Sequence, residues 1–168
     1  MKSAPLVVLI ALTSNPGFAQ MNHDAMPASG LVQFKTLVGS WKGTDPQWKP
    51  LTLSYKMVSE DKTLMESLGM EGKEESMITM YHLDNDGVMA THYCSMGNQP
   101  RMRLDRKKSN DHTFSFVYQD ATNLKSKKDP HINGLTITVK DKDHIFQEWS
   151  MIGKGKETRE IFTFERAD

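Results

Sequence analysis

The densest group of chemically capable side chains in the sequence lies between residues 81 and 94. This segment holds His82, His92 and Cys94, which is the only cysteine of the chain. Imidazole and thiolate side chains coordinate soft or borderline metal ions, and imidazole also exchanges protons near neutral pH. The centre of the segment, residues 84–87, reads Asp-Asn-Asp-Gly. These are turn-forming residues, so we expect a β-hairpin whose two strands present the reactive groups.

Two registers of this hairpin are open. If Gly87 takes a left-handed conformation at the third position of a three-residue loop, Asp84 pairs with Val88. If the loop instead spans residues 84–87, Leu83 pairs with Val88, and every side chain of one strand changes its partner. We favour the first register because glycine suits the left-handed position.

The register decides which groups lie together. In the first register one face of the hairpin collects Met80, His82, His92 and Cys94, whereas in the second His82 falls on the face opposite the other two. A shared face could bind copper or zinc through His82, His92 and Cys94. We favour a different interpretation, in which Cys94 is a small buried hydrophobe and the histidines are hydrogen-bonded polar groups in a cavity.

Such a cavity would have further polar lining. Tyr55 and Glu66 alternate with neighbouring residues in strand-like runs, and we expect both to face the same interior as the histidines. A few polar groups in an apolar pocket orient an apolar or amphipathic ligand. The predicted ligand contacts are therefore Tyr55, Glu66, Met80, His82, His92 and Cys94.

Methionine is frequent, with 12 residues in the chain. Flexible thioethers fill irregular cavities and adapt to ligands, which suits a pocket that tolerates different shapes. Near the N-terminus, Met21, His23 and Met26 have the spacing of a copper site made of thioether and imidazole ligands. The same spacing arises by chance in an unstructured tail, and this is the interpretation that we favour.

Motifs of common catalytic sites are absent from the sequence. It contains no G-x-S-x-G, no H-E-x-x-H, no phosphate-binding loop and no G-x-G-x-x-G. Residues 84–87 lack the remainder of a calcium loop. The 21 basic and 21 acidic residues leave no net charge, so the chain has no general electrostatic reason to bind nucleic acid.

The elements that would position these residues are mostly β-strands. From residue 51 onward, apolar and polar residues alternate with a period of two in short runs separated by turn residues. These runs, with a short strand at Trp41, predict an all-β fold of about ten strands, an antiparallel up-and-down barrel. Leu31, Phe34 and Leu37 predict a short helix before it. The polar residues 120–134 are expected to form a long loop.

The N-terminus has the layout of a secretory signal peptide. Lys2 precedes an apolar run over residues 4–12, and Gly17 and Ala19 flank Phe18 as small residues before a cleavage site. The run is too short for a stable membrane span, and we expect no transmembrane segment. We therefore predict a signal peptide over residues 1–19, a mobile tail over 20–28 and a barrel domain over 29–168, exported to the periplasm or secreted.

Two parts of the chain resemble known barrel families. The pattern F-x-x-L-V-G-S-W-x-G of residues 34–43 resembles the opening segment of the calycins, which include lipocalins, fatty-acid-binding proteins and nitrobindin-like barrels. The last strands, over residues 143–149 and 160–166, resemble an uncharacterised family of exported bacterial lipocalin-like proteins. The resemblance implies that Trp41 packs under a basic side chain of the last strand, Arg166 or else Arg159, and closes one end of the barrel.

The resemblance also implies an internal cavity for an apolar or planar ligand, and no catalytic residues. Nitrobindin-like barrels bind haem through a histidine, and no histidine of this chain matches that position. We therefore predict an exported protein that binds a small hydrophobic or amphipathic molecule in a barrel cavity, without catalysis and without a cofactor. The alternatives are a protein that handles copper, zinc or haem, and a cavity enzyme such as an isomerase.

Overall fold

The computed structural model describes residues 30–73 and 77–167. The predicted signal peptide (1–19) and tail (20–28) lie outside the described residues. The candidate copper ligands Met21, His23 and Met26 lie outside them as well.

The described chain consists of one 3₁₀ helix followed by β-strands. The helix, η1, spans Gly30–Leu37, and the strands in chain order are β1 (Gly39–Thr44), β2 (Pro50–Val58), β3 (Thr63–Met70), β4 (Met77–Asp84), β5 (Gly87–Tyr93), β6 (Gln99–Leu104), β7 (Thr113–Thr122), β8 (His131–Val139), β9 (His144–Gly153) and β10 (Lys156–Arg166). All ten strands pair antiparallel in chain order, and β1 pairs with β10 to close the barrel. The predicted all-β antiparallel barrel is therefore confirmed.

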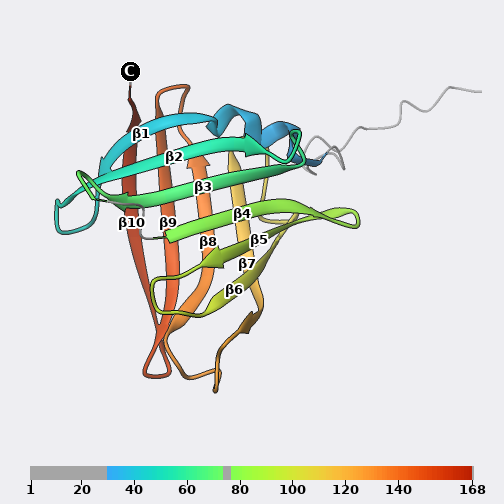
Figure 1. The fold of residues 1–168 in the computed structure, drawn as a ribbon, viewed down its shortest axis with the longest axis vertical. Coiled ribbons are helices and arrows are strands. Elements are labelled where there is room, and N and C mark those ends of the chain that lie inside the picture. Colours follow the sequence, from blue (N-terminus) through green and yellow to red (C-terminus); the bar gives the residue numbers. More distant parts are fainter. Residues whose placement is uncertain (1–29, 74–76, 168) are drawn as a thin grey trace, which may run out of the picture.

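The barrel is flattened into two walls that cross. Figure 1 shows β1, β2 and β3 running across β8, β9 and β10 at a steep angle. Alternate residues of each strand face the interior, as in β2, where Leu51, Leu53 and Tyr55 are buried between more exposed neighbours. The core is therefore built from every second residue of strands that the period-two pattern already marks.

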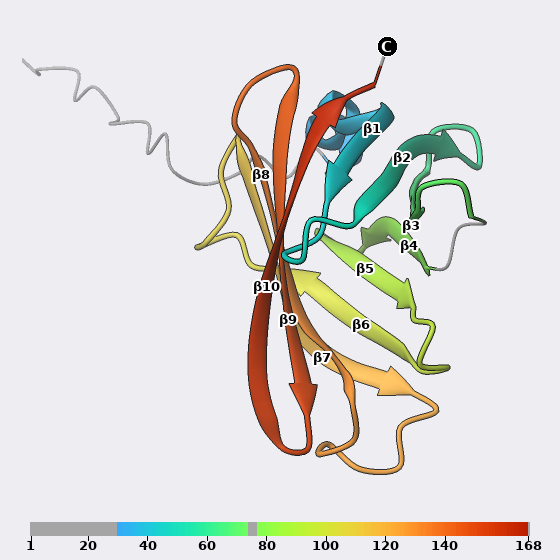
Figure 2. The ribbon, with the colours of Figure 1, turned by 90° about the vertical axis from the view of Figure 1, so that its left-hand side faces the viewer.

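One end of the barrel is plugged by η1. Its buried residues, Leu31, Phe34 and Leu37, recur every three positions, which is the period of a 3₁₀ helix. The Phe34 ring is fully buried and packs against the rings of Tyr81 and Phe114, with centroids 6.0 and 4.5 Å away. This end is therefore filled with side chains. In Figure 2 the β9–β10 hairpin and the β7–β8 connection extend from the opposite end.

Trp41 and Arg166 tie the helix to the first and last strands. Trp41 is 1% exposed, and its indole Nε1–H donates to the carbonyl of Leu37 at 2.9 Å. The Arg166 guanidinium lies 4.1 Å from the centroid of the Trp41 ring and donates to the carbonyls of Val38 and Thr36 at 3.0 and 3.1 Å. One cationic group thus satisfies the free carbonyls at the helix end while it covers the indole face.

Gly43 permits the close approach of β1 to its paired neighbour β10. A Cβ atom at this position would lie 2.0 Å from the carbonyl oxygen of Thr163 and 2.5 Å from the Phe164 ring. The backbone atoms of Thr163 cannot move aside without breaking the β1–β10 ladder. The second glycine of the G-x-W-x-G pattern is therefore required by packing at the seam where the barrel closes.

The register that we favoured for the hairpin at residues 84–87 is wrong. Leu83 pairs with Val88, and the pairing continues to Asp84 with Gly87, which leaves a two-residue loop. Asn85, with φ of 53°, takes the left-handed conformation in place of Gly87. Asparagine tolerates this conformation because its side chain can bond to nearby backbone.

The predicted long loop at residues 120–134 is shorter than expected. β7 continues through Thr122, and β8 begins at His131. The Arg101 guanidinium makes a bidentate ion pair with Asp120, with both N–O distances 2.6 Å, and this pair holds the extended end of β7 against β6. Only residues 123–130 remain as the connection.

Over residues 30–73 and 77–167, no helix has both the length and the apolar character that a membrane-crossing helix needs. The only helix of this part of the chain, η1, has eight residues.

Candidate functional site

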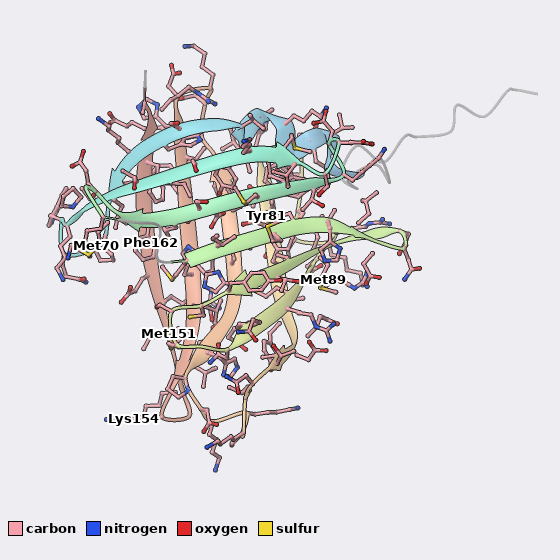
Figure 3. All side chains as sticks on the ribbon, in the orientation of Figure 1. Met70, Tyr81, Met89, Met151, Lys154 and Phe162 are labelled. Atoms are coloured by element: carbon pink, nitrogen blue, oxygen red, sulfur yellow. The ribbon has the colours of Figure 1, made fainter. Side chains whose placement is uncertain are left out.

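A pocket opens at the end of the barrel opposite η1. Its volume is about 270 Å³. Its wall is formed by the end of β3, the start of β4, the end of β5 with the segment after it, and parts of β8, β9 and β10: Leu68, Met77, His92, Cys94, Ser95, Met96, Ile132, Trp149, Met151, Thr158, Glu160 and Phe162. Met151 and Phe162 reach it from the neighbouring strands β9 and β10 (Figure 3). The lining is mainly apolar, with three thioethers and one thiol.

A row of polar side chains crosses the barrel interior next to this pocket, and His92 belongs to both. Tyr55 of β2 pairs with Glu66 of β3, Glu66 pairs with Thr79 of β4, and Thr79 pairs with His92 of β5. All four are 1–2% exposed. Directly opposed residues on adjacent strands project from the same face of a sheet, so the register alone aligns these four side chains.

Glu66 is the centre of the polar row. Its Oε2 accepts a hydrogen bond from the Tyr81 hydroxyl at 2.7 Å, and its Oε1 accepts one from the Thr79 hydroxyl at 3.4 Å. The amide of Gln147, from β9 on the far wall, donates to Oε2 at 3.1 Å. The Tyr55 hydroxyl is also hydrogen-bonded to Glu66. Four donors therefore converge on the two oxygens of one carboxyl group.

Trp149 fixes the orientation of the Gln147 amide. Its indole Nε1–H, which can only donate, bonds to Gln147 Oε1 at 2.9 Å. The Gln147 Nε2 must therefore face the other way, where it donates to the Tyr55 hydroxyl at 2.7 Å and to Glu66. The hydrogen bond between Gln147 and Glu66, which are 81 residues apart in sequence, therefore joins the two walls of the barrel.

Burial changes the acidity of these groups. It raises the pKa of Glu66 above its ordinary value, and the hydrogen bonds from Tyr81, Tyr55, Thr79 and Gln147 oppose that shift. Burial and the nearby Glu66 carboxylate raise the pKa values of Tyr55 and Tyr81 well above 10. Both tyrosines therefore keep their hydrogens and act as donors at any pH at which the protein works.

His92 joins the polar row to the pocket. Its ring is 1% exposed and lies 4.9 Å from the Trp149 ring, measured between centroids. Nδ1 is hydrogen-bonded to the Thr79 hydroxyl at 2.9 Å, whereas the buried Nε2 has no hydrogen-bond partner among the described residues. Burial lowers the pKa of His92 to about 4, so the imidazole is neutral at pH 7.

The predicted ligand contacts separate into two groups. Tyr55, Glu66 and His92 are brought together inside the barrel, and the half-buried Cys94 lines the pocket. Met80 and His82 alternate along β4 with the inward-facing Thr79 and Tyr81, and both are only partly buried. Their predicted place in the cavity is therefore wrong, because it depended on the hairpin register that the structure excludes.

Cys94 also differs from the expectation of a fully buried thiol. It follows the last residue of β5, where its backbone N–H donates to the Asn98 carbonyl at 3.2 Å and its carbonyl accepts from Gly97. The residue is therefore part of the β5–β6 turn at the pocket rim, not of the barrel interior.

Sequence reasoning missed four members of the site: Thr79, Tyr81, Gln147 and Trp149. Thr79 and Tyr81 follow from the second hairpin register, which turns the odd-numbered residues of β4 inward. Gln147 stands between Ile145 and Trp149 in an inward-facing apolar stripe. A single amide in an apolar stripe needs buried hydrogen-bond partners, so its presence there is the sequence feature that could have identified Gln147 as a site residue.

The pocket offers ligands for a soft metal ion but lacks the predicted arrangement. His92, Cys94 and the thioethers of Met77, Met96 and Met151 line one space, and such groups suit an ion of the copper(I) type. His82 lies on the other face of β4, so the predicted set of His82, His92 and Cys94 does not assemble. Within residues 30–73 and 77–167, no three His, Cys, Asp or Glu side chains gather in a metal-binding arrangement.

We expect His92 to make the protein less stable in mild acid. The unfolded chain binds a proton at His92 below pH 6.5, but the folded protein does so only below about pH 4. The free energy of unfolding therefore falls as the pH drops from 6.5 to 4, by about 3 kcal/mol when complete, and is unaffected by this group above 6.5.

Denaturant unfolding of wild type and His92→Gln across this pH range measures the effect. The difference between the two free energies of unfolding should change by about 3 kcal/mol from pH 6.5 to pH 4. The raised pKa of Glu66 changes the free energy of unfolding with pH in the opposite direction, but this effect is present in both proteins and cancels in the difference. His112→Gln, at an exposed position, should follow the wild-type curve. Parallel curves for wild type and His92→Gln would contradict the burial of a neutral imidazole.

Comparison with known proteins shows the fold. A crystal structure of a protein of unknown function from the DUF3598 family of Nostoc punctiforme PCC 73102 is similar, with a TM-score of 0.51 and 14% sequence identity. The similarity covers 85% of this chain and 50% of that chain, so this chain spans about half the length of its structural neighbour. No protein-family model matches the sequence, and no curated protein matches it.

Proposed function

We propose that this protein binds a small apolar or amphipathic molecule in the pocket lined by Met77, His92 and Met151. The observation that supports this most strongly is the contrast between the two ends of the barrel. One end is filled by η1 and the Phe34 ring, whereas the other holds an open, mainly apolar space of about 270 Å³. An apolar cavity with a few fixed polar groups is the usual form of a small-molecule site.

The pocket size limits the ligand. A volume of about 270 Å³ is just below the usual range for pockets that hold drug-sized molecules, so a smaller ligand is favoured. The three methionines of the lining adapt to different shapes because thioether side chains rotate freely. The lipocalin-like resemblance and the export signal predicted for residues 1–19 belong to the same proposal, in which the protein carries its ligand outside the cytoplasm.

Binding is favoured over catalysis by the chemistry of His92. A general base works best when its pKa lies near the working pH, whereas burial lowers the pKa of His92 to about 4. The Glu66 carboxyl group is enclosed by four donors and does not line the pocket. The ring of His92 is thus suited to accept a hydrogen bond and poorly suited to remove a proton.

Protection of Cys94 from a thiol reagent tests the proposal. Cys94 is half-buried at the pocket rim, so a bound ligand should cover it. With octan-1-ol at about ten times its Kd, labelling of Cys94 in the native protein should slow about tenfold by mass action. Unchanged labelling at the solubility limits of octan-1-ol and its isomer 1-methoxyheptane would contradict the proposal.

Two matched variants control the measurement. Met151→Trp fills the pocket and should abolish the protection by octan-1-ol. Met89→Trp introduces the same side chain on the outer face of β5, where Met89 alternates with the buried Val88 and Ala90. This variant should be protected like the wild type, and loss of protection in both variants would place the ligand elsewhere.

A further inference from the structure

The Nε2 atom of His92 is an unpaired polar atom at the inner wall of the pocket. It is buried without a hydrogen-bond partner, while the other nitrogen of the same ring is bonded to Thr79. A buried polar atom left unsatisfied costs roughly 1–3 kcal/mol, and no group of residues 30–73 or 77–167 satisfies this one, which points to a partner that enters the pocket. Which partner it accepts depends on whether Nε2 carries a hydrogen.

The surrounding donors favour the His92 tautomer that carries its hydrogen on Nδ1. The Trp149 indole orients Gln147, so that the Gln147 amide, Tyr55 and Tyr81 all direct hydrogens toward Glu66. The Thr79 hydroxyl has one hydrogen, which it donates to Glu66 Oε1. With Glu66 ionised, the Thr79 oxygen is then left to accept from His92, which puts the hydrogen on Nδ1 and a lone pair on Nε2.

We propose that the pocket selects an apolar molecule that ends in a hydrogen-bond donor, and that His92 Nε2 receives this donor. The hydrogen bonds between His92 and Thr79 and between Thr79 and Glu66 hold the ring in the tautomer whose Nε2 accepts a hydrogen bond. A partner on the other ring nitrogen orients many functional histidines in the same way. This inference rests on the proposed function and adds the chemical class of the ligand, namely a neutral hydroxyl or N–H group on an apolar body. Met77 and Met151 line the same pocket as His92, and their flexible side chains can move to let the donor reach the ring.

The same geometry disfavours carboxylate ligands. A carboxylate head would face the lone pair of Nε2 and would need a cation, but no Lys or Arg lines the pocket among the described residues. The charged residue of the lining is Glu160, an exposed carboxylate on β10. An anionic head would therefore lose its hydration without gaining a partner.

A pair of isomers isolates the contribution of the donor. Octan-1-ol and 1-methoxyheptane have the same atoms, but only the alcohol donates a hydrogen bond. The ratio of their Kd values is measured by Cys94 protection for wild type and for His92→Phe, which keeps a ring beside Trp149 but has no acceptor. Relative to this variant, wild type should favour the alcohol about tenfold more. Octanoate at pH 7 should protect Cys94 at least about tenfold less well than octan-1-ol.

The outcomes distinguish this inference from the proposed function. If neither isomer binds the wild type, the proposed function fails. If both bind and the ratio of Kd values is the same in wild type and His92→Phe, the pocket binds ligands but the donor preference is overturned. A preference for the alcohol that disappears in His92→Phe supports both.

Nitrogen-15 NMR of the imidazole ring tests the tautomer without a ligand, and it still applies if His92→Phe does not fold. In wild type at pH 7, the His92 signal should show hydrogen on Nδ1 and a bare Nε2. Thr79→Val removes the hydroxyl that fixes the tautomer, so the fraction with hydrogen on Nδ1 should fall. Thr158→Val, at the exposed rim, should leave it unchanged. Hydrogen on Nε2 in wild type would overturn the inference.

Discussion

Replacing Trp41 with alanine should lower the free energy of unfolding by about 3–5 kcal/mol. The indole is 1% exposed, and the change removes its packing, its hydrogen bond to the Leu37 carbonyl and the face on which Arg166 lies. Because Arg166 also bonds to the carbonyls of Thr36 and Val38, its displacement loosens η1 from the barrel. Denaturant unfolding followed by circular dichroism measures the loss.

Trp48→Ala is the matched control. Trp48 lies in the β1–β2 turn and is 83% exposed, so its removal should change the free energy of unfolding by no more than about 0.5 kcal/mol. Trp41→Phe should fall between the two, because it keeps a buried ring but loses the donor to Leu37. Equal losses for Trp41→Ala and Trp48→Ala would contradict the closure of the barrel by Trp41.

Replacing Glu66 with leucine should cost about 3–5 kcal/mol, although it adds an apolar side chain to a core. The carboxyl group accepts from Tyr55, Thr79, Tyr81 and Gln147, and leucine removes this shared acceptor from all four buried donors. Each unsatisfied donor costs roughly 1–3 kcal/mol, and part of that loss is recovered because the buried charge is gone.

Two further variants sharpen this measurement. Glu165→Leu changes an exposed glutamate of β10 and should stay within about 0.5 kcal/mol of wild type. Glu66→Gln keeps one acceptor oxygen but turns an amide toward donors, so its free energy of unfolding should lie between those of wild type and Glu66→Leu. A Glu66→Leu protein as stable as Glu165→Leu would show that the four donors find other partners.

Two of the site residues could be predicted from the alternation of apolar and polar residues alone. Tyr55 and Glu66 stand at inward-facing positions of strands that the alternation marks, and both lie in the polar row. The hydrogen-bond partners of Glu66 were not predictable in the same way. Gln147 is 81 residues away in sequence and belongs to the opposite wall, and only closure of the barrel brings it to the carboxyl group.

The sequence by itself determined a barrel of about ten antiparallel strands and the inward faces of strands such as β2 and β3, because alternating side chains point to opposite sides of a strand. Only the tertiary structure decided which histidine enters the barrel. Asn85 and Gly87 can each take a left-handed conformation, so the turn residues alone leave both registers open. The choice is made by packing in the closed barrel, where the observed register places Tyr81 opposite Ala90 and buries both side chains in the core. The same register turns Thr79 and His92 inward and His82 outward.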